Sequence, residues 1–416
     1  MLKSSTVAME QVEMSGHILD SLLLPKVLDI ILTRGGEYVI EEMKVGQHQN
    51  DPSHVRLRIQ TPNPQMLESI LAEIHPHGAI PLHASDCHTE LADKDGAFPD
   101  GFYCSTNFRT QVRLGGEWIE VEDQEMDCGI LVDPDGTSAR CLAMANVRRG
   151  DRIVIGRTGI RVFPISGDTH RHPGLFEFMT SPVSSERPKA VSVREVAQAM
   201  RRTREAGKKI IAVLGPAVVH TGGAELVAQL IRDGYIDVLF AGNAVATHDI
   251  EQAFYGTSLG VDLQQGLPTD EGHEHHLRTI NTIRRFGSIR AAVEAGRLTS
   301  GIMYECIKKP IPFVLCGSIR DDGPLPDVIT DILVAQDEMR KHVRGAGFCL
   351  MVATTLHSIA VGNLLPAAVK VACVDISPAT VTKLLDRGSS QTVGIISDAE
   401  PFLRSLVAEL NKSPDK

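Results

Sequence analysis

Aromatic residues are scarce in this chain of 416 residues, and the shortage limits how its core can be built. Phe, Trp and Tyr make up 4% of the sequence, whereas hydrophobic residues as a whole make up 43%. A chain of this length can bury a large core, so that core must consist mainly of Val, Ile, Leu and Ala. Such a composition favours buried parallel strands covered by helices.

The sequence also lacks paired cysteines and an apolar N-terminal segment. Its eight cysteines are scattered and form no CxxC pair, and a chain this long does not need disulfides to fold. Residues 1–14 contain no apolar run that could serve as a signal peptide. We therefore expect a cytoplasmic protein with reduced thiols.

Positive charge is in deficit, because the formal net charge is -10. This balance argues against nucleic acid or an anionic membrane as the main partner. The most apolar stretch, 348–374, contains His357, Asn363, Pro366 and Lys370, and burying such polar groups in lipid would cost roughly several kcal/mol each. We predict two buried strands joined by a loop here, rather than a membrane span.

The first 185 residues show two different patterns, which we expect to form two units. Residues 1–80 read as helix, strand, strand, helix, which is typical of the inside of a ferredoxin-like α+β unit. Residues 81–185 contain short strands and turns, with a hairpin signal at Gly115-Gly116, and predict a small β-rich subdomain. Residues 181–189 have the composition of a linker to the rest of the chain.

From residue 190 to 416, apolar strands alternate with helical patterns. Continuous apolar strands are typical of a sheet that is buried on both faces, so this alternation predicts a doubly wound parallel sheet of Rossmann-like type. The pattern does not give the order of the strands. The expected strands are 210–214, 236–240, 312–316, 348–353, 369–374 and 392–396, and the expected helices are 191–205, 224–232, 248–254, 326–342, 378–386 and 401–410.

Candidate site residues follow the predicted strands, because ligands bind beyond the carboxyl ends of strands in open α/β sheets. The glycine-rich segment 215–223 could approach a pyrophosphate, or could be a plain tight turn. Asp375 closes a strand, where its carboxylate could accept both ribose hydroxyls of an adenosine or could cap the next helix. Asp398 is better placed as a helix N-cap, although it could also line the adenine edge.

Three further polar clusters could carry chemistry. His273 and His276 have a helical spacing that suits a metal, but no third ligand is indicated and we predict a polar loop without metal. Lys308, beside a second lysine, could act as a base or imine former, or could be solvated at a helix end. The histidines and cysteine at 83–88 and the histidines at 170–172 match no standard zinc pattern.

Several stretches resemble the alternative, archaeal-type ornithine cyclodeaminase family, which shares an N-terminal region called LOR/SDH. They are HILDSLLLPKVLDIILTRGGEYVI (17–40), PDGFYCSTNFRTQVRLGGEWIEVEDQEMDCGI (99–130), VRRGDRIVIGRTGIRVFP (147–164), FMTSPVSSERPK (178–189) and AGNAVATHDIE (241–251). The resemblance runs from about residue 15 to residue 400, and the combination is specific although each piece alone is not.

The resemblance implies an NAD-dependent, redox-neutral conversion of L-ornithine to L-proline and ammonia. It also implies that the C-terminal domain is similar to the NAD-binding fold of deoxyhypusine synthase. Larger members fuse the same region to an arginine dihydrolase domain, and we expect no such activity here. By position, the implied cofactor contacts are Asn243, Ala244, Asp322, Thr354, Thr355, Leu356, His357, Asp375 and Asp398.

Such a reaction needs groups that hold the substrate within a closed pocket. Arg320 follows a predicted strand and is the best-placed residue to hold a carboxylate. Asp321 or Glu305 could accept an ammonium group.

Proton transfer is assigned from position to one of three side chains, Lys308, His275 or His357, whose pKa values would have to lie near neutrality. Cys306 would be reactive only if its thiolate were stabilised, and the nearby lysines would help. The catalytic candidates are Cys306, Lys308, His275, Arg320 and Asp321.

Two other function classes remain open at this point. One is an NAD-dependent amino-acid dehydrogenase on the same scaffold, which would release NADH. The other is a nucleotide- or amino-acid-sensing module, because ferredoxin-like units often bind small ligands. Polar, titratable strand ends favour an enzyme over a sensor, and a homo-oligomer is expected from the frequency of symmetric assemblies.

Overall fold

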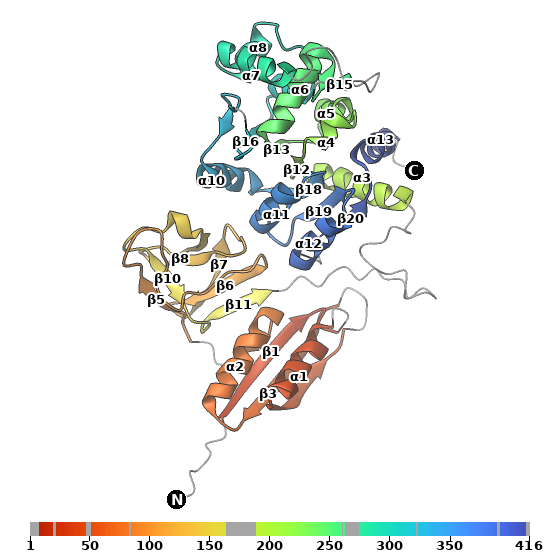
Figure 1. Cartoon of the computed structure of the whole chain (residues 1–416). Coiled ribbons are helices and arrows are strands. Elements are labelled where there is room, and N and C mark those ends of the chain that lie inside the picture. Colours follow the sequence, from red (N-terminus) through yellow and green to blue (C-terminus); the bar gives the residue numbers. More distant parts are fainter. Residues whose placement is uncertain are drawn as a thin grey trace, which may run out of the picture. The chain divides into compact units, whose positions relative to one another are not determined.

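The computed structural model describes residues 8–19, 22–46, 51–82, 85–163, 189–259, 261–262, 274–321, 323–388 and 392–412. The chain divides into two compact units, shown in Figure 1. The first comprises residues 1–172 with 365–368, and the second comprises 173–364 with 369–416. Within the described ranges, no helix combines the length and apolar character that crossing a membrane requires.

The first unit begins with a ferredoxin-like α+β fold, as the sequence predicts. Its sheet has the order β2-β3-β1-β4 and is antiparallel. The sequence pattern indicates the four elements from α1 to α2 but misses the first and last strands along the chain, of which β1 lies inside the sheet and β4 is two residues long. The elements are β1 (Ala8–Gly16), α1 (Leu23–Thr33), β2 (Glu37–Lys44), β3 (Ser53–Thr61), α2 (Pro64–Ile74) and β4 (Ile80–Pro81).

One face of this sheet packs against α1 and α2. Alternate residues of β3, namely Val55, Leu57 and Ile59, are fully buried in that core, because successive side chains of a strand point to opposite faces. The Asn63 side chain accepts a hydrogen bond from the Met66 amide at 2.8 Å and so caps the N-terminus of α2.

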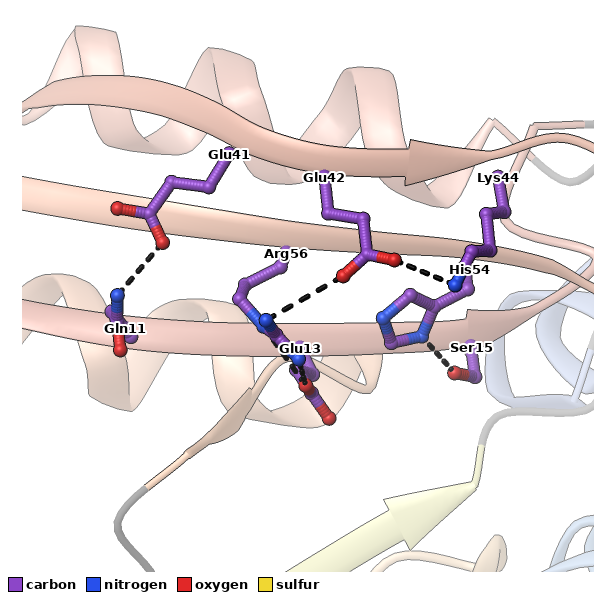
Figure 2. Close-up of polar contacts among 8 residues, drawn as sticks. All are labelled: Gln11, Glu13, Ser15, Glu41, Glu42, Lys44, His54 and Arg56. Carbon is purple, nitrogen blue, oxygen red and sulfur yellow. Dashed lines mark hydrogen bonds and ion pairs between the residues drawn. The ribbon is translucent and has the colours of Figure 1, made fainter.

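The opposite face of the same sheet carries a lattice of charges, drawn in Figure 2. Arg56 of β3 lies between Glu13 of β1, at 2.7 Å, and Glu42 of β2, at 3.5 Å. His54 and Ser15 form a hydrogen bond of 2.8 Å beside them. The charged side chains of Arg56, Glu13 and Glu42 are each about one third exposed. Water therefore competes for every contact, and the pairs stabilise the sheet little.

The first unit continues with a seven-stranded sheet of order β11-β6-β7-β9-β8-β10-β5. The predicted hairpin is confirmed, because β6 and β7 are antiparallel neighbours joined by Gly115 and Gly116. Both glycines have positive φ, which tight two-residue hairpin turns require. The strands are β5 (His88–Leu91), β6 (Arg109–Leu114), β7 (Glu117–Glu122), β8 (Gly129–Val132), β9 (Ala139–Leu142), β10 (Arg152–Ile155) and β11 (Ile160–Phe163).

The second unit confirms the predicted parallel α/β fold. All neighbours in its seven-stranded sheet are parallel, in the order β17-β16-β13-β12-β18-β19-β20. The predicted linker 181–189 lies outside the described residues except for its last residue, which begins α3. The strands are β12 (Lys209–Leu214), β13 (Val238–Gly242), β16 (Phe313–Cys316), β17 (Val328–Ile329), β18 (Ala346–Val352), β19 (Lys370–Asp375) and β20 (Thr392–Ile396).

Helices surround this sheet, and a two-strand ladder follows α6. The ladder is β14 (Thr257–Ser258) with β15 (Val261–Asp262). The helices are α3 (Lys189–Glu205), α4 (Ala217–His220), α5 (Ala224–Arg232), α6 (Asn243–Tyr255), α7 (His275–Phe286), α8 (Ile289–Glu294), α9 (Ile302–Lys308), α10 (Ile332–Val343), α11 (Thr355–Leu364), α12 (Pro378–Gly388) and α13 (Ala399–Leu410).

The loop predicted between the strands β18 and β19 is wrong, because helix α11 occupies this position. Its apolar residues do not gather on one side, so no helical periodicity is visible in the sequence. Gly362 suggests a break, yet it is a packing contact: a Cβ there would lie 3.0 Å from the Leu384 side chain of α12. Similarly, α10 begins later than predicted, since Asp331 caps it through the amides of Leu333 and Val334.

Candidate active site

The order of the parallel sheet reverses between its central strands, β12 and β18, and ligands bind at such a switch point. The loops that follow these strands touch there. A Cβ on Gly215, after β12, would lie 1.8 Å from the carbonyl oxygen of Ala353, after β18. Ala353 itself has a positive φ of 54°. Only glycine fits at position 215, and the backbones of the two loops lie against each other.

Helix α11 brings predicted cofactor residues from two strand ends together. His357, in its first turn, reaches β13, because its Cε1 would lie 3.3 Å from a Cβ on Gly242. Asn243 and Ala244 follow directly in α6. Burial lowers the pKa of His357 below its ordinary value, so this ring is neutral near pH 7.

Asn243 also has a structural task. Its Oδ1 accepts hydrogen bonds from the Leu325 amide at 3.0 Å and from the Thr247 hydroxyl at 3.3 Å. The side chain is buried, so this bond anchors the segment that follows β16 to the start of α6. Asp322, predicted in that segment, lies outside the described residues.

The remaining predicted cofactor residues lie at the ends of β18, β19 and β20. Thr354 precedes α11, the Thr355 hydroxyl is 2.7 Å from that of Thr380, and Leu356 is exposed. Asp375 is buried, and its Oδ1 accepts from the Ser377 amide at 2.8 Å.

Asp398 caps helix α13 through the Ala399 amide, at 2.6 Å. The predicted N-cap is therefore confirmed at Asp398. In the described residues, the Asp375 carboxylate has no partner for its Oδ2.

The environment of Cys306 does not favour a thiolate. The side chain is in the core of the second unit, and burial, together with the nearby carboxylates of Asp249 and Glu305, raises the pKa of the thiol well above its ordinary value. Lys308, which was expected to help, is exposed, and its ammonium lies over the Tyr304 ring, 5.7 Å from the centroid.

The residues predicted to bind the substrate already have other partners or are exposed to solvent. Glu305 forms an ion pair with Arg232 at 2.8 Å, so its carboxylate already has a cation. Arg320 is exposed, and Asp321 accepts from the amide of Ser318 at 2.8 Å within the same turn. His275, in contrast, belongs to a network of titratable side chains that position alone did not reveal.

That network is centred on Glu251, in the buried helix α6. The Glu251 side chain is completely inaccessible, yet both carboxylate oxygens are hydrogen-bonded. Oε2 faces Nδ1 of His248 at 2.9 Å, and Oε1 accepts from the Thr257 hydroxyl at 3.0 Å. Burial of a carboxylate is tolerated when donors of this kind surround it.

Two more histidines complete the network from neighbouring elements. The Thr257 hydroxyl is 2.8 Å from Nδ1 of His275, whose ring stacks on Tyr255. His220, from α4, lies edge-on to His248 with ring centroids 4.8 Å apart, and its Nδ1 is 2.6 Å from the Ser258 hydroxyl.

Burial, with the neighbouring imidazole of His248, lowers the pKa of His220 to about 4. Helix α6, at the centre of the network, contacts α4, α7 and the ladder strand β14.

Sequence reasoning found only His275 of this network. One signal was available, because His248 and Glu251 are three residues apart and so share one side of the predicted helix 248–254. The pairing with His220 and Thr257 depends on the fold. Among the residues described, no group of three or more His, Cys, Asp or Glu side chains is placed to hold a metal ion.

A parallel sheet with a central switch point, glycine-dependent contact between its loops and polar strand ends defines an α/β protein of the Rossmann-fold class. Comparison with known proteins agrees. Residues 194–406 match the family model of the arginine dihydrolase ArgZ-like C-terminal Rossmann fold. Residues 9–108 match the LOR/SDH bifunctional enzyme conserved region, and residues 109–193 match the first region of the ArgZ-like C-terminal part.

The similarity extends over whole relatives. The chain is 52% identical to an ornithine cyclodeaminase of Methanothermobacter thermautotrophicus, over 97% of this chain and 98% of that protein. It also matches an ornithine cyclodeaminase of Methanopyrus kandleri with 52% identity, over 98% of both chains. The chain therefore belongs to the ornithine cyclodeaminase family that carries an N-terminal LOR/SDH region.

Solved structures of longer relatives align as well. The apo structure of ArgZ, an arginine dihydrolase from the ornithine–ammonia cycle in cyanobacteria, matches with a TM-score of 0.82 and 40% identity, over 99% of this chain and 60% of ArgZ. The ternary complex of AgrE with ornithine and NAD⁺ matches with a TM-score of 0.53 and 43% identity, over 97% of this chain and 58% of AgrE.

Proposed function

We propose that this protein is a lyase that converts L-ornithine to L-proline and ammonia, with NAD as a resident cofactor. The observation that carries the proposal is the 52% identity, over nearly the whole chain, to a protein named ornithine cyclodeaminase. The switch point of a Rossmann-fold unit supports the choice of a dinucleotide. The AgrE complex supports the pairing of NAD with ornithine, although AgrE is a longer protein.

The residues at the switch point fit a dinucleotide. Gly215 lets the two central loops pack against each other, and both loops lie at the strand ends where a dinucleotide binds in this class of sheet. The Oδ2 atom of Asp375 is available to a ribose hydroxyl at a buried strand end. Bound NAD would supply the hydride acceptor and donor for a reaction that is redox-neutral overall. The protein's own task is to bind, orient and deprotonate the diamine.

The test is to incubate the purified protein with L-ornithine and NAD and to measure proline, ammonia and NADH together. Equal amounts of proline and ammonia without accumulation of NADH are expected. NADH that accumulates in step with product would instead indicate an amino-acid dehydrogenase. Binding of NAD without turnover would indicate a sensing module.

The role of Asp375 is tested with Asp375→Asn, measured by titration of NAD against the protein. We expect weaker binding of about 10-fold or more, because an amide oxygen is a poorer acceptor than a carboxylate for two hydroxyls. Arg320→Met, at an exposed position after β16, tests the carboxylate contact through the KM for ornithine. An unchanged KM would remove Arg320 from the site.

A further inference from the structure

The hydrogen bonds around Glu251 fix which nitrogen of two histidines carries a proton. When ionised, the Glu251 carboxylate can only accept, and the His248 Nδ1 that faces it at 2.9 Å then donates. The Thr257 hydroxyl gives its hydrogen to Glu251, and its oxygen must therefore accept from Nδ1 of His275. Both imidazoles are held in the tautomer that leaves Nε2 as a basic lone pair.

Nothing in the described part of the chain uses those lone pairs. Nδ1 of His220, His248 and His275 each bonds to a neighbour, whereas Nε2 of each has no partner among the described residues. A carboxylate that orients an imidazole through Nδ1 and leaves Nε2 toward a reactant is the arrangement that catalytic acid–base histidines use.

The proposed reaction requires such a group. Ornithine enters with both nitrogens protonated, and the δ-ammonium must lose a proton before its nitrogen can attack the α-carbon. The new bond joins the δ-nitrogen to the α-carbon, and the bond from the α-carbon to the α-nitrogen breaks. Because proline and ammonium leave with all the protons of the substrate, a group that takes a proton must give it back.

We propose that His248 is the residue that transfers this proton and that Glu251 is its positioning residue. This rests on the proposed function. Nε2 of His248 takes the proton from the δ-ammonium and returns it to the departing α-nitrogen. Glu251 keeps the lone pair on Nε2 and stabilises the imidazolium while it exists. Through Thr257, the same carboxylate also sets the tautomer of His275.

Glu251→Gln is the variant that tests the role of the carboxylate. An amide can donate to Nδ1 and so favours the wrong tautomer of His248, and kcat is expected to fall about 100-fold or more. The acid limb of the pH profile of kcat should move to lower pH, because the negative charge that favours the imidazolium is gone. Glu251→Asp should restore part of the rate.

The matched control is Glu338→Gln. Glu338 also faces a histidine, with its Oε1 3.4 Å from Nε2 of His342, but the pair lies on α10 with a carboxylate about one third exposed. We expect kcat and its pH profile to match the wild type. Equal losses in both variants, or wild-type kcat with an unchanged profile in Glu251→Gln, would overturn the role of Glu251.

A readout independent of turnover is the tautomer itself. Nitrogen NMR of protein labelled at its histidines should show Nε2 of His248 without a proton in the wild type, with the signal assigned by its loss in His248→Gln. Protonated Nε2 in the wild type would overturn the proposal. If Glu251→Gln does not fold, His248→Gln tests the same proposal. This variant should bind NAD normally and lose kcat, and a wild-type kcat would contradict the proposal.

The two proposals fail in different ways. Wild-type protein that forms no proline from ornithine would overturn the proposed function and this role with it. Wild-type protein that forms proline, beside a His248→Gln variant that does so equally fast, would overturn only the role of His248.

Discussion

The two units carry polar networks that differ in how far water can reach them. On the sheet of the first unit, Arg56 lies between Glu13 and Glu42, and all three side chains are about one third exposed. In the second unit, the Glu251 carboxylate is inaccessible, and it is hydrogen-bonded to the His248 imidazole, the Thr257 hydroxyl and the Leu259 amide. Water can reach the charged groups of the first network but not the carboxylate at the centre of the second. Burial, rather than the number of contacts, therefore distinguishes a network that can hold chemistry.

The largest effect should come from removing the centre of the buried network. Glu251→Leu leaves the donors of His248 and Thr257 without an acceptor in the core, so the free energy of unfolding should fall by about 3 kcal/mol. Glu13→Leu, the matched change on the exposed sheet face, should cost less than about 1 kcal/mol. Urea unfolding followed by circular dichroism measures both. Similar losses would remove the distinction between the networks.

A second difference concerns how the helices are capped. Asp249 of α6 accepts from the amides of Ile302 and Met303, both at 2.8 Å, and so caps α9, whose own N-cap residue is Gly301. Asp249→Ala should lower the free energy of unfolding by about 2 kcal/mol, because two buried amides lose their acceptor. Asn63→Ala, at the cap of α2, should cost about 1 kcal/mol. The reverse order in urea unfolding would contradict this ranking.

The two networks should also respond in different pH windows. The folded-state pKa of His220 is about 4, against about 6.5 in an unfolded chain. Between these values only the unfolded state binds the proton, so the free energy of unfolding falls as the pH is lowered from 6.5 toward 4. His220→Asn should lose that part of the slope in urea unfolding across this window. An unchanged slope would place His220 outside the buried network.

The exposed charges around Arg56 affect the free energy of unfolding at lower pH. The hydrogen-bonded Lys44 ammonium, with Arg56, holds the pKa of Glu42 below its ordinary value. Its stabilisation is therefore complete above an unfolded pKa of about 4.3 and is lost as the pH falls through the lower folded-state pKa. Glu42→Gln should therefore change the pH dependence of the free energy of unfolding only below about pH 4.3. Acid titration of the wild type and the variant measures this change.

The smallest effect is expected for Arg56→Ala. Removing this cation breaks two exposed pairs, and the loss in free energy of unfolding should be small and should shrink at high salt, where exposed charges are screened. Urea unfolding at low and high salt, followed by the fluorescence of Trp118, the single tryptophan of the chain, reports on the first unit. A loss independent of salt would mean that Arg56 acts through packing.

The sequence predicted those features that depend on local pattern. Alternation in β3 marks Val55, Leu57 and Ile59 as the covered face, and the pair Gly115-Gly116 marks a turn with positive φ. Helix α11 was missed because its apolar residues do not gather on one side: Leu356 is exposed, whereas the polar Ser358 is buried. Local pattern is thus a sufficient guide only where apolar and polar residues separate onto opposite sides of an element.

The buried network could not be predicted, for a different reason. His220, Glu251 and His275 come from three helices, and their contacts exist only because α4, α6 and α7 meet beside β14. Asp398 was predicted correctly as a cap since an N-cap depends on its own helix alone. For the other predicted site residues, such as Arg320 after a strand and Lys308 before one, position along the chain did not determine which side chains meet.

The central place of β12 in the sheet has a consequence for synthesis of the protein. One edge of β12 is covered by β13 soon after it is made, whereas the other must await β18, beginning at Ala346. At about 5–20 residues per second this delay is on the order of ten seconds. Throughout it an apolar strand presents an unpaired edge, which is a template for aggregation. Ribosomes stalled before residue 346 should yield aggregating chains, and ribosomes stalled after β20 should not.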